Sequence, residues 1–139
     1  MNGKVFVDSN VLVYAHDQDA GARQEHAAQH LETLWDSRSG RLSTQVLQEF
    51  YVNATRKITK PLSASVARDV IRNYSLWVEH PITPSTVVRA SDISEAWMLS
   101  FWDSMTFASA EQDNAQILLT EDMNHGQVIV GIRVVNPFL

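Results

Sequence analysis

Four acidic residues that lie far apart in the sequence are the residues best suited to chemistry in this chain of 139 residues. Each lies where an apolar element ends or where a helix is predicted to begin. Carboxylates at close quarters repel one another unless protons or metal ions neutralise them, and Mg²⁺ and Mn²⁺ prefer such hard oxygen ligands. If the fold gathers these residues, they predict a site for one or two such ions: Asp8, Glu49, Asp103 and Asp122.

Two of the four acids directly follow predicted strands. Asp8 comes after the apolar run 5–7, and Asp122 comes after the run 116–120. Ligand sites in parallel sheets lie at the carboxyl ends of the strands, so both acids fall on one edge if the two strands are adjacent. Each also has a structural explanation. Asp8 can cap the next helix, a role that the polar residues after it could equally fill, and Asp122 can belong to an ordinary polar turn.

The other two acids are predicted to lie on helices. Glu49 shares a helical stripe with Val46 and Phe50, which places its carboxylate beside the core, where an unpaired charge is costly. A basic or backbone partner would be the structural explanation. Asp103 follows Ser100 by three residues, which is the pattern of a capping box. Taken alone, capping explains Asp103 better than metal binding does.

Alternation along the strand decides between two neighbouring acids near residue 120. Side chains of a strand point alternately to its two faces, so Thr120 and Asp122 are expected to point together and Glu121 to point away. His125 lies near the same edge and is interpreted as a turn residue rather than as a catalytic base.

Short apolar runs alternate with segments of helical periodicity along the chain. This alternation predicts one α/β domain over residues 1–139, with a three-layer α/β/α fold and a central parallel sheet of four or five short strands flanked by helices. The strands are expected at 5–7, 41–43, 116–120 and 132–135, and the helices at 11–15, 23–36, 44–58, 63–77, 85–99 and 102–112.

The composition limits the possible classes of protein. An apolar share of 45% excludes a chain that is disordered by composition, and the lack of cysteine excludes a disulfide framework or a thiolate metal site. The sequence begins without the apolar run of a signal peptide and has no stretch near the ~20 apolar residues of a membrane span, so we expect a cytoplasmic protein. A net charge of −5 counts against general nucleic-acid binding, unless bound cations invert the local field.

Five segments of the chain resemble the PIN-domain family and, within it, the VapC-type toxin ribonucleases of bacterial toxin–antitoxin pairs. These segments, which together extend over nearly the whole chain, are 5–10, 48–51, 101–104, 118–123 and 125–138. The resemblance implies a PIN-like fold. It places the family's acidic site on the same four acids, with Asn10 and Thr120 as supporting polar residues. Ser104 stands where relatives often have alanine, and so small a residue should not block metal binding.

The resemblance also implies an activity and its partners. The expected reaction is hydrolysis of RNA phosphodiester bonds with one or two Mg²⁺ or Mn²⁺ ions. The expected partners are the RNA substrate, a cognate antitoxin protein and a second copy of the chain in a homodimer. Two alternatives stay open. One is a PIN-type nuclease that acts in RNA processing or on DNA, and the other is a non-catalytic α/β binding module whose acids are caps and surface charges.

Basic and aromatic residues give weaker indications. Five basic residues on two predicted helices are candidates for contacts with RNA phosphates, although a solvated helix surface explains them equally well: Arg56, Lys57, Lys60, Arg68 and Arg72. Four tryptophans are interpreted as core or interface residues rather than as platforms for base stacking: Trp35, Trp77, Trp97 and Trp102.

Overall fold

Five strands form one sheet in the computed structural model, which describes residues 3–139. The strands are β1 (Lys4–Val7), β2 (Gly40–Arg41), β3 (Ala115–Leu119), β4 (Val128–Ile129) and β5 (Ile132–Val135), in the spatial order β2-β1-β3-β5-β4. β1 pairs in parallel with both β2 and β3, and β3 pairs in parallel with β5. β4 pairs antiparallel with β5 at one edge.

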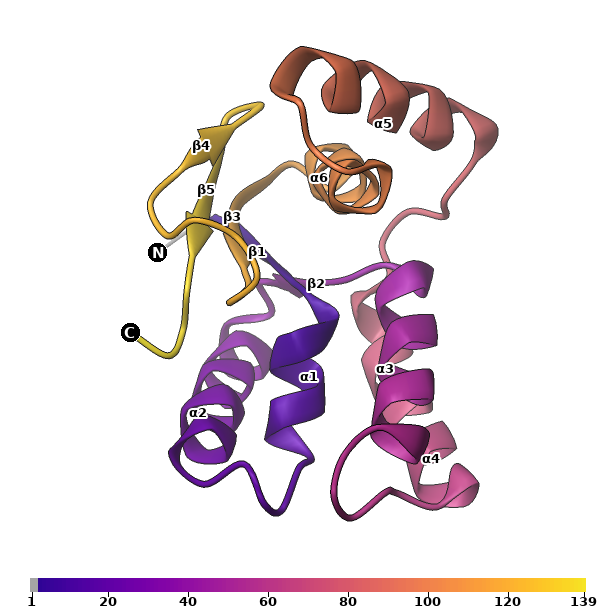
Figure 1. The fold of residues 1–139 in the computed structure, drawn as a ribbon, viewed down its shortest axis with the longest axis vertical. Helices are drawn as coiled ribbons and strands as arrows, with labels where there is room; N and C mark the ends of the chain where they lie inside the picture. The colour runs from indigo at the N-terminus through magenta and orange to yellow at the C-terminus, as the bar shows by residue number, and fades with distance from the viewer. Residues whose placement is uncertain (1–2) are drawn as a thin grey trace.

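Helices cover both faces of this sheet (Figure 1). α6 packs against β3 and β5, and α5 packs on α6, while α1 and α2 lie on the opposite face with α3 and α4 beside them. This arrangement confirms the predicted three-layer α/β/α fold. Within residues 3–139, no helix is both long and apolar enough to cross a bilayer. The helices are α1 (Ser9–Ala15), α2 (Ala22–Ser37), α3 (Thr44–Arg56), α4 (Ala64–Tyr74), the short 3₁₀ helix η1 (Ser75–Trp77), α5 (Pro84–Trp97) and α6 (Phe101–Gln112).

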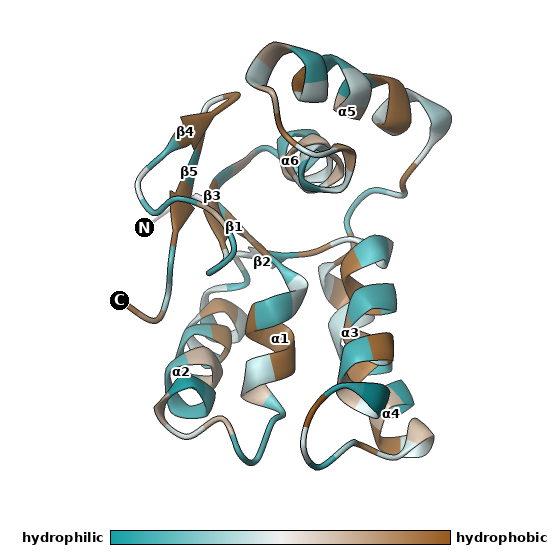
Figure 2. Ribbon diagram, viewed as in Figure 1, coloured by the Kyte–Doolittle hydropathy of each residue, from teal (hydrophilic) through white to brown (hydrophobic). Residues whose placement is uncertain are grey.

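The core lies where the central strands meet the helices. Phe6 and Val7 of β1, Leu118 of β3 and Val134 of β5 are fully buried. Parallel strands covered by helices on both faces are buried on both sides, which is why these strands consist of apolar runs. Figure 2 shows the hydrophobic residues concentrated in the strands, whereas the helices carry hydrophilic residues as well.

Among the strands, the clearest differences from the predicted elements concern β4 and β2. β4 was not predicted, because two residues are too few to show a period. It turns back onto β5 through Val130 and Gly131, which have φ angles of 47° and 80°. The second strand was predicted at 41–43 but is formed by Gly40–Arg41. Ser43 instead caps α3, because its Oγ accepts a hydrogen bond from the N–H of Val46 at 3.3 Å.

Candidate active site

A cavity of about 340 Å³, here called the acid cavity, opens at the carboxyl ends of β1 and β3 between α3 and α6. Val7 of β1 is in register with Leu119 of β3, so the residues that follow the two strands lie side by side. All four predicted acids line this cavity. The lining residues are Asp8, Glu49, Asp103 and Asp122, together with Ser9, Asn53, Lys57, Trp102 and Thr106.

Asp8 is the most buried of the four acids, with 7% of its surface exposed. One carboxylate oxygen accepts from the N–H of Ser9 at 2.8 Å, and the other accepts from the hydroxyl of Thr120 at 3.0 Å. Asp8 is therefore the N-cap of α1 as well as a residue of the acid cavity. Burial raises the pKa of Asp8 to about 6, these hydrogen bonds oppose the rise, and the carboxylates of Glu49 and Asp122 add to it.

Asn10 and Thr120 connect the two strand ends. The Asn10 side-chain amide donates to Thr120 Oγ1 at 2.8 Å and to Asp122 Oδ2 at 3.1 Å. Thr120 Oγ1 also accepts from the N–H of Asp122 at 3.1 Å, while its own proton goes to Asp8. These bonds orient two of the acids toward the same cavity.

Glu121 faces a different part of the molecule. Its carboxylate accepts from the hydroxyl of Tyr14 at 2.6 Å and from Nε of Arg23 at 3.2 Å. Thr120, by contrast, is fully buried and bonds to Asp8. The side chains after β3 therefore point in alternate directions, as the strand geometry predicts.

α3 presents a row of polar side chains to the acid cavity. Glu49, Asn53 and Lys57 follow one another at intervals of four residues, which brings them to the same side of the helix. The amide of Gln45, one turn earlier, is 3.4 Å from Glu49 Oε2. The sequence reasoning did not assign Asn53 to the site, although its spacing from Glu49 would have indicated it.

α6 supplies Asp103 and two further lining residues that the sequence reasoning did not assign to the site. The N–H of Asp103 donates to Ser100 Oγ at 3.1 Å, so Ser100 caps the helix. Thr106, one turn later, is buried and also lines the cavity. Trp102 lines it as well and is 65% exposed, so the core position considered for this tryptophan is wrong.

Within residues 3–139, the four acids have no cationic partner within 4.0 Å. Throughout residues 3–139, the ion pairs within 4.0 Å involve other carboxylates. Unpaired carboxylates that face one cavity repel one another, and a hard cation would relieve that repulsion. The donor set therefore fits Mg²⁺ or Mn²⁺. In residues 3–139, only Glu79, His80 and Asp113 place three possible metal-ligand atoms within 4.8 Å of one another. The acids of the acid cavity would therefore have to move closer together to bind an ion.

Among the five basic residues considered for RNA contact, Lys57 is the one that lines the acid cavity. Lys60 Nζ lies 3.8 Å from Asp19, and Arg72 Nη1 lies 2.8 Å from Asp69, so both have acidic partners of their own. The remaining two are exposed on α3 and α4: Arg56 and Arg68.

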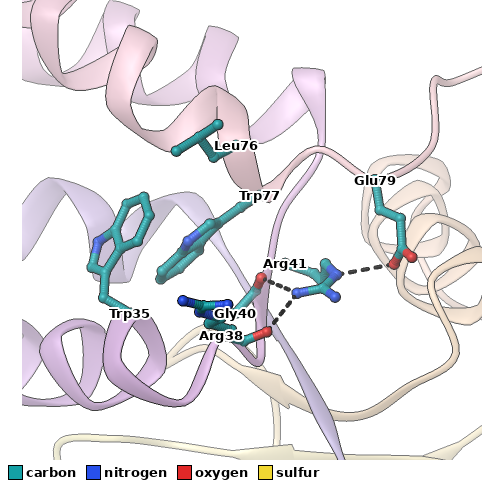
Figure 3. A pocket seen from close by; sticks show the side chains of 7 residues that line it. All are labelled: Trp35, Arg38, Gly40, Arg41, Leu76, Trp77 and Glu79. Atoms are coloured by element: carbon teal, nitrogen blue, oxygen red, sulfur yellow. Dashed lines mark hydrogen bonds and ion pairs between the residues drawn. The ribbon is translucent and has the colours of Figure 1, made fainter.

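A larger cavity of about 430 Å³ lies beside β2 (Figure 3). Two of its charged side chains, Arg41 and Glu79, already have partners. Arg41 Nε is 2.9 Å from Glu79 Oε1, and Arg41 Nη1 donates to the carbonyl oxygens of Gly40 and Arg38. These groups fasten the edge strand, and we therefore regard the smaller acid cavity as the candidate active site. The larger cavity is lined by Trp35, Arg38, Gly40, Arg41, Leu76, Trp77 and Glu79.

Several solved structures share this fold at low sequence identity. A toxin–antitoxin complex from Klebsiella pneumoniae matches with a TM-score of 0.67 and 19% identity, covering 96% of this chain and 98% of that one. VapC20 of Mycobacterium tuberculosis, described as a Sarcin-Ricin loop cleaving toxin, matches with a TM-score of 0.63 and 22% identity, covering 94% and 99%. FitAB bound to a DNA fragment matches with a TM-score of 0.67 and 14% identity, covering 97% and 96%.

Sequence comparison assigns the family. No curated protein matches the chain. The family model of the PIN domain, however, matches residues 5–129, which include the whole acid cavity. This match extends over most of the chain, and it agrees with the fold. The chain therefore belongs to the PIN-domain family.

Proposed function

We propose that this protein is a Mg²⁺- or Mn²⁺-dependent endoribonuclease and that the acid cavity is its active site. The observation that supports this most strongly is the gathering around one cavity of four carboxylates that form no ion pair with any residue of 3–139. The fold alone would require no such arrangement, because unpaired charges at close quarters cost free energy. Membership of the PIN-domain family agrees with a nuclease.

The four acids would hold the metal: Asp8, Glu49, Asp103 and Asp122. When bound, the ion supplies positive charge at the reacting phosphate and activates water for in-line attack. Asp8 must lose its proton to act as a ligand, and its raised pKa makes this step dependent on pH.

The surrounding side chains hold the ligands and the substrate. Thr120 and Asn10 orient Asp8 and Asp122 through the hydrogen bonds described above. Partners of this kind fix ligand geometry, and losing one typically costs a metalloprotein about 10- to 100-fold in metal affinity or activity. Lys57 supplies a positive charge at the wall formed by α3, where a substrate phosphate would pass.

The biological role that we propose is that of a toxin in a type II toxin–antitoxin pair. Structures with the same fold are described as a toxin–antitoxin complex and as a toxin that cleaves the Sarcin-Ricin loop. On this proposal the chain works in the cytoplasm, forms a homodimer and is inhibited by a cognate antitoxin. Expression of the chain alone and together with a candidate antitoxin would test this role, and unimpaired growth on expression of the chain alone would argue against it.

The Asp103→Asn variant tests the activity. We expect it to lower the rate of RNA cleavage with Mn²⁺ by about a hundredfold or more, because the ion contributes several kcal/mol to stabilising the transition state. Asp36→Asn, an exposed residue of α2, is the matched control and should retain the wild-type rate. Circular dichroism would check that both variants are folded. Unchanged cleavage by Asp103→Asn would refute the site, and a wild-type protein that neither cleaves RNA nor binds Mn²⁺ would indicate a binding module.

A further inference from the structure

Trp102 differs in kind from every other residue of the acid cavity in the described part of the chain. The other lining side chains are polar or charged, and Trp102 is the single apolar one. Its side chain is 65% exposed and meets Phe101 edge to face, with ring centroids 5.2 Å apart. Because it directly precedes Asp103 in the first turn of α6, the helix fixes its place beside that acid.

The cavity combines three features that match the parts of a nucleotide strand. Carboxylates with a bound ion would engage a phosphate, and Lys57 on the α3 wall would engage a neighbouring phosphate. Trp102 on the α6 wall offers a flat π-surface next to them. Proteins that bind single strands combine a charged path for the backbone with aromatic side chains on which bases stack.

We propose that Trp102 is the stacking platform for an unpaired base beside the scissile phosphate. This inference rests on the proposed function and adds a substrate-binding residue to it. In an A-form duplex the bases are stacked within the helix, and an indole on the cavity wall cannot reach a base face. Trp102 thereby selects strands whose bases can turn outward.

A protein partner is the competing occupant of this region. Trp97, Met98 and Phe101 lie near Trp102 in the sequence and are also exposed, by 45%, 92% and 36%. The core of a protein interface is typically depleted of charge. Trp102, however, shares its cavity with four carboxylates and Lys57, and the other three exposed residues do not line that cavity. This setting favours a nucleotide over an apolar protein surface.

Steady-state cleavage of a short single-stranded RNA of mixed sequence tests the inference in the full chain with Mn²⁺. Trp102→Leu should raise KM roughly tenfold and leave kcat nearly unchanged, whereas Trp102→Phe should retain most of the wild-type KM because its ring can still stack. Trp97→Leu is the matched control, an exposed tryptophan away from the cavity, and should have the wild-type KM. A substrate with an abasic site beside the cleaved bond should be insensitive to Trp102→Leu.

A spectroscopic measurement gives a second readout that does not depend on turnover. RNA binding should quench tryptophan fluorescence in the wild type and in Trp97→Phe, and this quenching should be lost in Trp102→Phe. An unchanged KM for Trp102→Leu, or an equal loss on duplex and single-stranded RNA, would overturn the inference. A change of oligomeric state with unchanged KM would also overturn it and would assign Trp102 to a protein interface. In each of these cases wild-type cleavage persists, whereas failure of the proposed function would abolish cleavage itself.

Discussion

Acidic residues lie at both ends of β1 and β3, and the two ends differ in how their charges are balanced. At the amino end, Glu79 is 2.9 Å from both Lys4 Nζ and Arg41 Nε, and Asp113 is 2.8 Å from His80 Nδ1. At the carboxyl end, the four acids of the acid cavity have no such partner within residues 3–139. The same residue types thus stabilise the fold at one end and leave negative charge for a ligand at the other.

The pKa directions of Glu79 and Asp8 agree with this contrast, although burial raises the pKa of Asp113 at the amino end as well. Hydrogen bonds from Lys4 and Arg41 lower the pKa of Glu79, so the protein itself favours the anion there. At the opposite end, burial raises the pKa of Asp8, and the nearby carboxylates of Glu49 and Asp122 raise it further. Forming the Asp8 anion therefore costs more free energy than it does for an exposed aspartate, and a bound cation would offset that cost. This difference supports the proposal that the acid cavity, and not the amino end, binds the ion.

Mn²⁺ binding should depend on the acids at the carboxyl ends of β1 and β3 and not on the acids at their amino ends. For the wild type at a free Mn²⁺ concentration of a thousand times Kd, we expect the free energy of unfolding to rise by about 4 kcal/mol. Glu49→Gln should lose most of this gain because it removes a proposed ligand. The matched variant Glu79→Gln should keep it, although its own stability without metal will be lower. Urea unfolding with and without Mn²⁺ measures both.

Equal gains in the two variants would show that Glu49 is not a ligand. If Glu79→Gln instead lost the Mn²⁺-dependent rise in the free energy of unfolding, the ion would bind at Glu79, His80 and Asp113. The possible ligand atoms of these three residues lie within 4.8 Å of one another. Either result would break the distinction between the two ends.

The pH dependence of stability should report the buried Asp8 carboxyl. Its pKa rises from the ordinary 3.8 to about 6 on folding, so the folded state binds more protons than the unfolded state between these values. Stability without metal should therefore fall as pH rises from about 4 to 6 and then level off, by about 3 kcal/mol from this group. Denaturant unfolding across this range, with a chelator present, measures the slope.

Asp8→Asn provides the control for this slope, because it removes the titrating group and keeps a side chain of similar shape. The pKa of Asp113 is also raised by burial and contributes in the same direction, so the difference between the two profiles isolates Asp8. Identical profiles for wild type and Asp8→Asn would mean that ionising the buried Asp8 costs no free energy. The argument that the acid cavity attracts a cation would then lose its main support.

Local signals in the sequence were sufficient to place Asp8 and Asp122 at the carboxyl end, whereas the assignment of Asp103 depended mainly on the family resemblance. Apolar runs located β1 and β3, and their ends located Asp8 and Asp122, because a parallel sheet brings such ends to one edge. Alternation then separated Asp122 from Glu121. These inferences needed only the period of a strand and the layout of an α/β sheet.

The remaining features depend on contacts between segments far apart in the chain. Lys4 and Glu79 are 75 residues apart, and no local pattern predicts that they meet. Trp102 was interpreted as a core or interface residue, and its exposure excludes only the core position. The ion pairs that distinguish the amino ends of β1 and β3 from their carboxyl ends therefore depend on the fold and not on any sequence motif.

The smallest effect that we predict concerns His80 at the amino end. His80→Ala should lower the free energy of unfolding by about 1–3 kcal/mol, because Asp113, whose side chain is 4% exposed, would lose a hydrogen-bond partner at 2.8 Å. RNA cleavage and the gain from Mn²⁺ should both stay at the wild-type level, since His80 does not line the acid cavity. Urea unfolding and a cleavage assay on the same preparation test both. A folded variant that has lost cleavage would show that the amino end takes part in the chemistry, because a purely structural role for His80 alters only stability.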